Sequence, residues 1–447
     1  MKRFKIEQSD MEITGQTGLA LIGQAIKRHT HLTSHVDNSV ARRHGITHSD
    51  VLKSYLGLLG VAKNDFEAIN SIDSDFFFQS ALDVDEIPSE ATLRQRMDRY
   101  ATKFLPIVKK ASWDFLKNSR PEFKPLSTGH IPLDADVTPM DNSRTRKEGV
   151  SRTYKGCDGF APMAVYLGQE GYCIDLELRE GKQHCQKGTP DLLANALQRA
   201  RDITPLPILV RLDGGNDSIE NIDVILEFND QTSESEAVDF IIKWNPRQQD
   251  RESWLAHAEQ QGRWSEPRAG KRVALFSISH ERTWRGYQYQ VRRVMRVIER
   301  TIDKHGQSLL VPEIEIEGWW TSLDLPEEDV IHWYADHGTS EQFHSELKSD
   351  MDVERLPSGN FGTNSLILLL SMLAFNCLRT IGQQMLELKE HSPVKLPVKR
   401  RRIKSVIRDL ILIACKYVRR SNQNFIKLGK CNPWFSMYEA LYQRFAA

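Results

Sequence analysis

The feature that most constrains this chain is a set of four side chains in its C-terminal third, whose spacing fits one face of a helix. Tyr334, His337, Glu341 and Lys348 follow one another at intervals of three, four and seven residues. At about 100° per residue, these positions fall within one narrow stripe of an α-helix. We therefore expect a phenol, an imidazole, a carboxylate and an ammonium group to face the same cleft.

Two upstream segments with the apolar, β-branched composition of strands end in acids. In the first, residues 131–138, strand alternation places Asp134 and Asp136 on the same face, so either could be a metal ligand. The second is followed by Asp213 and two glycines, which allow a sharp turn that exposes the carboxylate; Asp217 is the weaker alternative. Two strand-borne aspartates and a helix-borne glutamate suit a site that holds two divalent metals for phosphoryl transfer.

These motifs resemble those of the DDE transposases of bacterial insertion sequences. The similarity is closest to the branch whose glutamate helix has Tyr, two residues, Arg, three residues, Glu, six residues and Lys, and within it to the insertion-sequence family numbered thirteen-eighty. Tyr334, Glu341 and Lys348 match this pattern, and His337 stands where the family has arginine. Residues 86–94 are similar to the family's N-terminal PS-x-x-T-L segment. The resemblance covers most of the chain.

The resemblance implies a cut-and-paste transposase that binds the terminal inverted repeats of its element, cleaves double-stranded DNA and joins 3′-OH ends to target DNA. Because the family's first aspartate precedes x-Thr, it favours Asp136 over Asp134, with Asp213 and Glu341 completing the catalytic acids. These three would hold two Mg²⁺ (or Mn²⁺) ions, and pairing of two ends implies a dimer on DNA. The alternatives are a catalytically inactive, domesticated DNA-binding protein and an RNase H-like nuclease without strand transfer.

The order of elements predicts an α/β fold, which the resemblance specifies as RNase H-like: a mixed five-stranded sheet with flanking helices. Three antiparallel strands, followed by helix, strand, helix and strand, should place Asp136 and Asp213 side by side. The expected parts are a helical end-recognition region (1–125), the first part of the core (126–246), a β-rich insertion (247–329), the glutamate helix (330–350) and a helical, basic C-terminal region (351–447).

Within the cleft, Tyr334 and Lys348 are candidates for holding phosphate groups. His337 could do so only while its imidazole is charged, and His344, about two turns further on, is an alternative.

Outside the cleft, Trp319 and Trp320 are candidates for stacking on a flipped base, although such a pair also suits a core. The other candidates for DNA contact are Arg292 and Arg293 in the insertion and the basic run Arg400, Arg401 and Arg402. This run opens a predicted helix over Arg401–Arg419, and a phosphate-contacting helix and a solvated face explain it equally well.

Composition adds few constraints. Lys+Arg 60 and Asp+Glu 60 give a net charge of zero, so overall charge does not indicate a nucleic-acid partner. The six cysteines form no CxxC pair, and the first residues lack an apolar signal segment, so we expect reduced, buried thiols in a cytoplasmic protein. The resemblance implies that this protein is bacterial. The longest apolar run, Leu366–Phe375, is about half the length of a membrane span and predicts a core helix.

Overall fold

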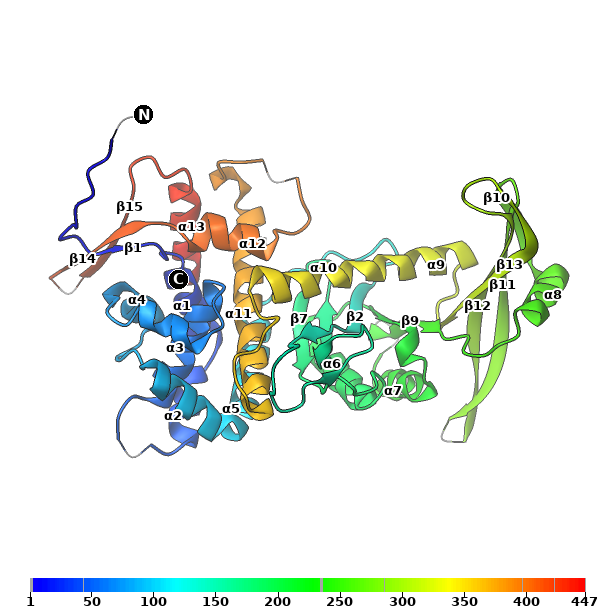
Figure 1. Ribbon diagram of the computed structural model, residues 1–447, viewed down its shortest axis with the longest axis horizontal. Helices are drawn as coiled ribbons and strands as arrows, with labels where there is room; N and C mark the ends of the chain where they lie inside the picture. Colours follow the sequence, from blue (N-terminus) through cyan, green and yellow to red (C-terminus); the bar gives the residue numbers. More distant parts are fainter. Residues whose placement is uncertain are drawn as a thin grey trace.

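A mixed sheet lies in the middle of an elongated molecule (Figure 1). Helices from both ends of the chain gather on one side of it, and the long strands of the insertion extend on the other (Figure 1). The computed structural model describes residues 3–42, 44–233, 236–284, 286–395, 397–421 and 423–446.

The five predicted core strands are present. They are β2 Ile131–Val137, β6 Met163–Leu167, β7 Tyr172–Glu177, β8 Ile208–Leu212 and β9 Val238–Trp244. β6 pairs antiparallel with β2 and β7, whereas β8 pairs parallel with β2 and β9. Because Ala135 lies opposite Leu212, the next residues on these adjacent strands are Asp136 and Asp213. The prediction that β2 and β8 are adjacent strands is confirmed.

The sheet is nevertheless larger than the five strands predicted. In the described part of the chain it has nine, in the order β10-β11-β12-β13-β9-β8-β2-β6-β7. The additional strands are β10 Arg263–Arg268, β11 Lys271–Trp284, β12 Tyr287–Ile302 and β13 Ser308–Thr321, and helix α8 Arg251–Gln261 precedes them. β13 pairs antiparallel with β9, so the insertion satisfies hydrogen-bonding groups that an edge strand would leave open.

Helices cover the sheet. They include α5 Glu90–Ser119, α6 Thr189–Ile203, α7 Ile219–Asn229 and α11 Phe361–Glu387. α11 packs against β7 and α5. Among the described residues it is the one helix long and apolar enough to cross a membrane, and 94% of its most apolar stretch is buried inside the fold. Leu366–Phe375 lies within it, so the predicted core helix is confirmed.

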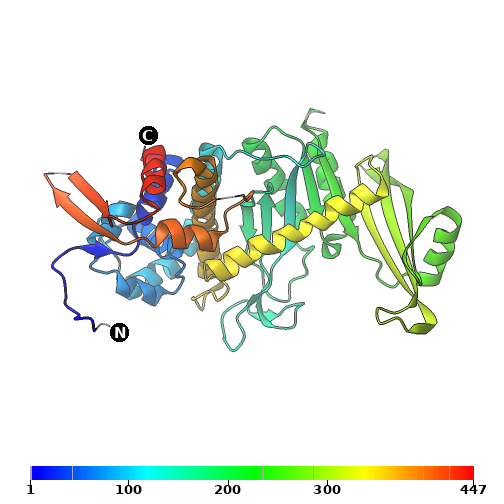
Figure 2. The same cartoon turned by 90° about the horizontal axis from the view of Figure 1, so that it is seen from above.

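The glutamate helix runs along one side of the sheet as a continuous rod (yellow in Figure 2), but it is not a regular α-helix. Its parts are α9 Glu327–Ala335, a 3₁₀ turn at Asp336–Gly338, α10 Thr339–Ser345 and a π-helical turn at Glu346–Asp350. A π-helical turn contains an extra residue, so the angular spacing used for the prediction changes between Glu341 and Lys348.

The remaining elements lie mainly at the helical end of the molecule. The N-terminal region contains β1 Ile13–Thr14, α1 Leu19–His29, α2 Leu32–Ser39, α3 His48–Gly60 and α4 Phe76–Leu82. The C-terminal region contains α12 Ile403–Val406, a π-helical turn at Ile407–Ile411, β14 Cys415–Arg420, β15 Gln423–Leu428 and α13 Phe435–Ala446. A small sheet near the glutamate helix is formed by β3 Met140–Asp141, β4 Ser151–Arg152 and β5 Asp158–Phe160.

The predicted helix over Arg401–Arg419 is wrong after Ile411. The chain turns there and forms the hairpin β14–β15, and β14 also pairs with β1. Cys415 and Tyr417 are buried and alternate with an exposed residue, which is the pattern of a strand with one covered face. Pairing with the distant β1 decides the structure of this segment.

Candidate active site

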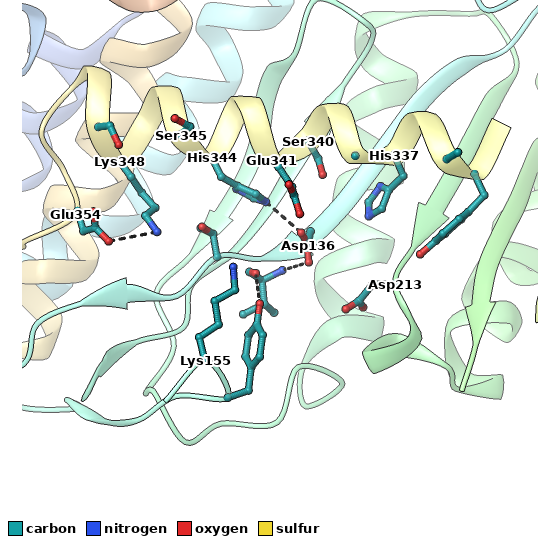
Figure 3. Close-up of a pocket in the computed structure, with 17 residues that line it drawn as sticks. Asp136, Lys155, Asp213, His337, Ser340, Glu341, His344, Ser345, Lys348 and Glu354 are labelled. Atoms are coloured by element: carbon teal, nitrogen blue, oxygen red, sulfur yellow. Dashed lines mark hydrogen bonds and ion pairs between the residues drawn. The ribbon is translucent and has the colours of Figure 1, made fainter. Parts of the chain in front are cut away.

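A cavity of about 680 Å³ lies beside the glutamate helix and collects the predicted acids. Asp136 comes from β2, Asp213 follows β8, and Glu341 lies on α10. Figure 3 shows the three carboxylates directed into the same space. The other members of the predicted stripe line the cavity too: Tyr334, His337 and Lys348.

The two aspartates experience different electrostatic surroundings. Burial raises the pKa of Asp213, and the neighbouring charge of Asp136 raises it further. Burial also opposes the ionisation of Asp136, but His344 outweighs this effect and lowers the pKa of Asp136. His344 Nε2 lies 3.5 Å from Asp136 Oδ2, a contact that is an ion pair when the imidazole is protonated. A cation in the cavity would relieve the repulsion between the two carboxylates.

Asp134 has a different environment, although it shares a strand face with Asp136. Arg211 Nε and Nη2 donate to its two oxygens, each at 2.7 Å. His337 Nδ1 lies 3.0 Å from Asp134 Oδ1. Burial opposes ionisation, but the Arg211 charge and the His337 contact hold the pKa of Asp134 below its ordinary value. Asp134 is thus neutralised by protein groups and does not line the cavity that holds Asp136.

The three cavity acids fit hard divalent cations in their chemistry, because carboxylate oxygens are the preferred protein ligands of Mg²⁺ and Mn²⁺. Across the described ranges, no three His, Cys, Asp or Glu side chains are gathered closely enough to form a ready-made metal site. Binding ions here would therefore draw the carboxylates of Asp136, Asp213 and Glu341 together. A bound cation would also offset burial and the charge of Asp136, the two causes that raise the pKa of Asp213.

Comparison with known families decides which protein class this site belongs to. The family model described as "Transposase DDE domain group 1" matches residues 1–447. The chain belongs to this DDE transposase family. Membership implies an enzyme of DNA cleavage and transfer, and such enzymes generally use divalent metals.

Comparison with solved structures gives a piggyBac transposase synaptic complex with hairpin DNA. The match has 12% sequence identity and a TM-score of 0.42, and it covers 90% of this chain and 82% of that chain. No curated protein matches the chain. The predicted family is confirmed at the level of DDE transposases, while the insertion-sequence family and bacterial origin stay predictions.

The other stripe residues of the transposase already have protein partners. Lys348 Nζ donates to the carbonyl of Pro139 at 2.6 Å and lies 3.3 Å from Glu354 Oε1. The ring of Tyr334 packs 5.7 Å from that of His337. Burial opposes the charged form of His337, but Asp134 raises its pKa above the ordinary value. His337 thus holds Asp134, a function the sequence did not suggest for the residue in the arginine position.

The structure contradicts a base-stacking role for Trp319 and Trp320. The two side chains are only 2% and 6% exposed. Lys243 Nζ lies 4.1 Å from the centre of the Trp319 ring, and Trp320 Nε1 donates to Asp217 Oδ1 at 3.0 Å. Both indoles belong to the junction between β13 and the core sheet, so a base could not reach their faces. Asp217, the alternative second acid, accepts the hydrogen bond from Trp320 and does not line the cavity.

The two insertion arginines contact other groups of the protein. Arg293 is 7% exposed, and its guanidinium lies within about 5 Å of the ring centres of Trp244, Trp254 and Trp320. Arg292 donates to the backbone carbonyl of Leu323 at 3.1 Å. Both guanidinium groups thus lie at the junction between the insertion and the core sheet, and their predicted phosphate contacts stay predictions.

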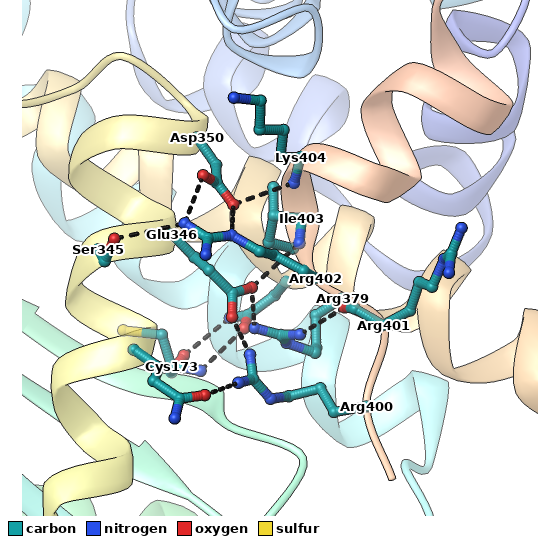
Figure 4. Close-up of polar contacts among 12 residues, drawn as sticks. Cys173, Ser345, Glu346, Asp350, Arg379, Arg400, Arg401, Arg402, Ile403 and Lys404 are labelled. Carbon is teal, nitrogen blue, oxygen red and sulfur yellow. Dashed lines mark hydrogen bonds and ion pairs between the residues drawn. The ribbon is translucent and has the colours of Figure 1, made fainter. Parts of the chain in front are cut away.

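The basic run near residue 400 forms ion pairs within the protein. Arg400 binds Glu346 and Arg402 binds Asp350 (Figure 4). Arg401 binds Asp409. The sequence shows 12 Lys or Arg residues from His391 to Lys430, but not that buried acids pair with these three, two of them on the glutamate helix and one within the segment itself. Arg400 and Arg401 are mostly buried in these contacts, whereas the Arg402 side chain is 55% exposed, so a phosphate contact by this run stays a prediction.

Sequence analysis missed two residues that line the cavity from the opposite direction. Tyr154 and Lys155 lie in the loop between β4 and β5. Figure 3 shows Lys155 below the acids. Partial burial, and then the charges of Asp136 and Asp213, raise the pKa of Tyr154 to about 12. The sequence shows these two residues only as a Tyr-Lys pair followed by glycine, and nothing in their spacing links them to the glutamate helix.

Proposed function

We propose that this protein is an active cut-and-paste DNA transposase that cleaves the ends of its element and joins the 3′-OH ends to target DNA. The observation that supports it most directly is the convergence of Asp136, Asp213 and Glu341 on one cavity. These acids come from neighbouring strands and from a helix more than a hundred residues later, so their meeting is a property of the tertiary structure. The arrangement of the five core strands supports an RNase H-like core.

In the proposed mechanism, Asp136, Asp213 and Glu341 hold two Mg²⁺ or Mn²⁺ ions. The ions would activate the attacking water or 3′-OH and stabilise the departing oxygen. Asp134 belongs to the supporting structure because Arg211 neutralises it. Lys155 and Lys348 supply positive charge on two sides of the cavity, where they would hold the phosphates that flank the scissile bond.

The proposed substrate is double-stranded DNA: the terminal inverted repeats of a bacterial insertion sequence and a target site. Pairing of two ends would require self-association on DNA. The reaction would take place in the cytoplasm, where the chromosome is accessible. The excess of Lys and Arg from His391 to Lys430 supports contact with DNA through those cations that are not paired with acids.

A strand-transfer assay with Mg²⁺ and labelled DNA that carries the ends of the element tests the proposal. Joined products are expected from the wild type, and neither cleavage nor joining is expected from Asp136→Ala, Asp213→Ala or Glu341→Ala. Gel shifts should show that the three variants still bind DNA. Nicks without joined products would instead support the nuclease, and DNA binding without cleavage would support an inactive DNA-binding protein.

A further inference from the structure

The face of the glutamate helix turned away from the cavity carries two buried acids that hold the helix to the rest of the molecule (Figure 4). Glu346 and Asp350 begin and end the π-helical turn, which lies between Glu341 and the end of the helix. They are 1% and 8% exposed, so their charges depend on protein partners.

Glu346 is held from two directions. Its Oε2 accepts from Arg379 Nη2 at 2.7 Å and from the backbone N–H of Ile403 at 3.1 Å. Its Oε1 accepts from Arg400. Arg379 is fully buried on α11, the core helix, whereas Arg400 belongs to the segment that precedes α12. One carboxylate thus connects the glutamate helix, the core helix and the C-terminal region.

Asp350 repeats this arrangement four residues later. Its oxygens accept from Arg402 Nε at 2.7 Å and Nη2 at 2.9 Å, and from the backbone N–H of Lys404 at 3.1 Å. Arg400 also donates to Gln342, the residue next to Glu341, at 3.0 Å. The segment from Arg400 to Lys404 therefore contacts the glutamate helix before the π-helical turn and at both ends of the turn.

These contacts fix both the rotation and the register of the helix. A π-helical turn is uncommon and needs local support, because its backbone geometry is less favourable than that of an α-helix. Here the support comes from both ends of the turn, at Glu346 and Asp350. If the turn relaxed to regular α-helix, Lys348 and the residues after it would rotate relative to Glu341. The set of side chains that lines the cavity would then change.

We propose that Glu346 and Asp350, with Arg379, Arg400 and Arg402, are positioning residues that set the placement of Glu341 and Lys348 in the cavity. The inference rests on the proposed function, in which Glu341 holds metal. Neither Glu346 nor Asp350 lines the cavity, so neither would contact metal ions held there. Outer residues that orient metal ligands typically change metal affinity or activity by about 10–100-fold when replaced.

Glu346→Gln tests the proposal, because it removes the charge and keeps the shape. Asp409→Asn is the matched control, since Asp409 is a buried carboxylate that pairs with Arg401 and Arg408 instead of with the glutamate helix. Mn²⁺ binding is measured by electron paramagnetic resonance, and Mn²⁺-dependent nicking is measured on a supercoiled plasmid. Hydrogen exchange is measured on the peptide that covers residues 339–350.

For Glu346→Gln we expect Mn²⁺ affinity and nicking rate each to fall by about tenfold or more, with faster hydrogen exchange across residues 339–350. Asp409→Asn should leave Mn²⁺ affinity, nicking rate and hydrogen exchange unchanged, even if it lowers thermal stability as much as Glu346→Gln does. Equal effects of the two variants, or wild-type behaviour of Glu346→Gln, would overturn the positioning role. If the wild type neither binds Mn²⁺ nor nicks DNA, the proposed function fails. The hydrogen-exchange measurement then decides the positioning role by itself. Faster exchange in Glu346→Gln supports that role, and unchanged exchange refutes it.

Discussion

Removing one member of the Asp134–Arg211 pair should strongly destabilise the transposase. The two side chains are at most 4% exposed, and two hydrogen bonds of 2.7 Å join them. Arg211→Met would leave the Asp134 carboxylate buried with His337 as its remaining side-chain partner. Breaking a buried pair in this way costs about 3–5 kcal/mol, because the remaining charge is neither hydrated nor neutralised.

This free energy converts to a shift in Tm. The entropy of unfolding is about 2.1 cal/mol/K per residue, which gives about 0.9 kcal/mol/K for a chain of 447 residues. Arg211→Met should therefore lower Tm by about 3–5 °C in differential scanning calorimetry at neutral pH. The double variant Asp134→Asn, Arg211→Met should recover much of the loss, because no uncompensated charge stays buried.

The pH dependence gives a second, independent test of the same pair. Since the pKa of Asp134 is lowered in the folded protein, its contribution to stability is complete above the unfolded value of about 3.9 and is lost as pH falls through the folded value. The gap in Tm between wild type and Arg211→Met should thus close in acid. The reasoning would be refuted if Arg211→Met lowered Tm by less than about 1 °C at neutral pH. It would also be refuted if the double variant lost as much stability as Asp134→Asn and Arg211→Met lose in sum.

Three further predictions concern side chains around the site. Lys348→Met should weaken binding of a duplex DNA probe and lower the slope of log affinity against log salt by about 1, measured by fluorescence anisotropy; an unchanged slope would remove Lys348 from the phosphate contacts. Trp319→Ala should cost about 3–5 kcal/mol in thermal unfolding without changing the DNA affinity of the folded protein, and a selective loss of affinity would restore a stacking role. The raised pKa of His337 means that its contribution to stability is complete below the unfolded value of about 6.5 and is lost as pH rises through the folded value. The Tm difference between wild type and His337→Asn should therefore shrink on raising the pH, and a difference that grows would contradict the assignment.

Local patterns were sufficient to predict the elements that carry the site. The apolar runs ending at Leu212 and around Asp136 gave two strands, and the order of elements placed these strands side by side, as the register of β2 and β8 confirms. The spacing from Tyr334 to Lys348 gave a helix whose polar stripe faces one cavity. Such patterns are informative because strand alternation and helical periodicity depend on the backbone alone.

Patterns of charge and aromatic residues were less informative. Arg402 and Trp319 have the residue types of a DNA-binding surface, but one pairs with Asp350 and the other is buried beneath Lys243. The hairpin β14–β15 was missed for a similar reason, since β14 gains its pairing from β1, about 400 residues earlier in the chain. Whether a cation meets a phosphate or a carboxylate depends on which distant segment packs against it.

The sequence by itself therefore determined the order of strands and helices, the adjacency of Asp136 and Asp213, and the membership of Glu341 in the same site. The resemblance favoured Asp136 over Asp134, but only the tertiary structure supplies the physical reason, because Arg211 and His337 neutralise one carboxylate and leave the other facing the cavity. It also decided that Arg400 and Arg402 pair with acids of the glutamate helix. The physical reason is that backbone periodicity is local, whereas neutralising a buried charge requires a partner that only the folded chain brings within a few ångströms.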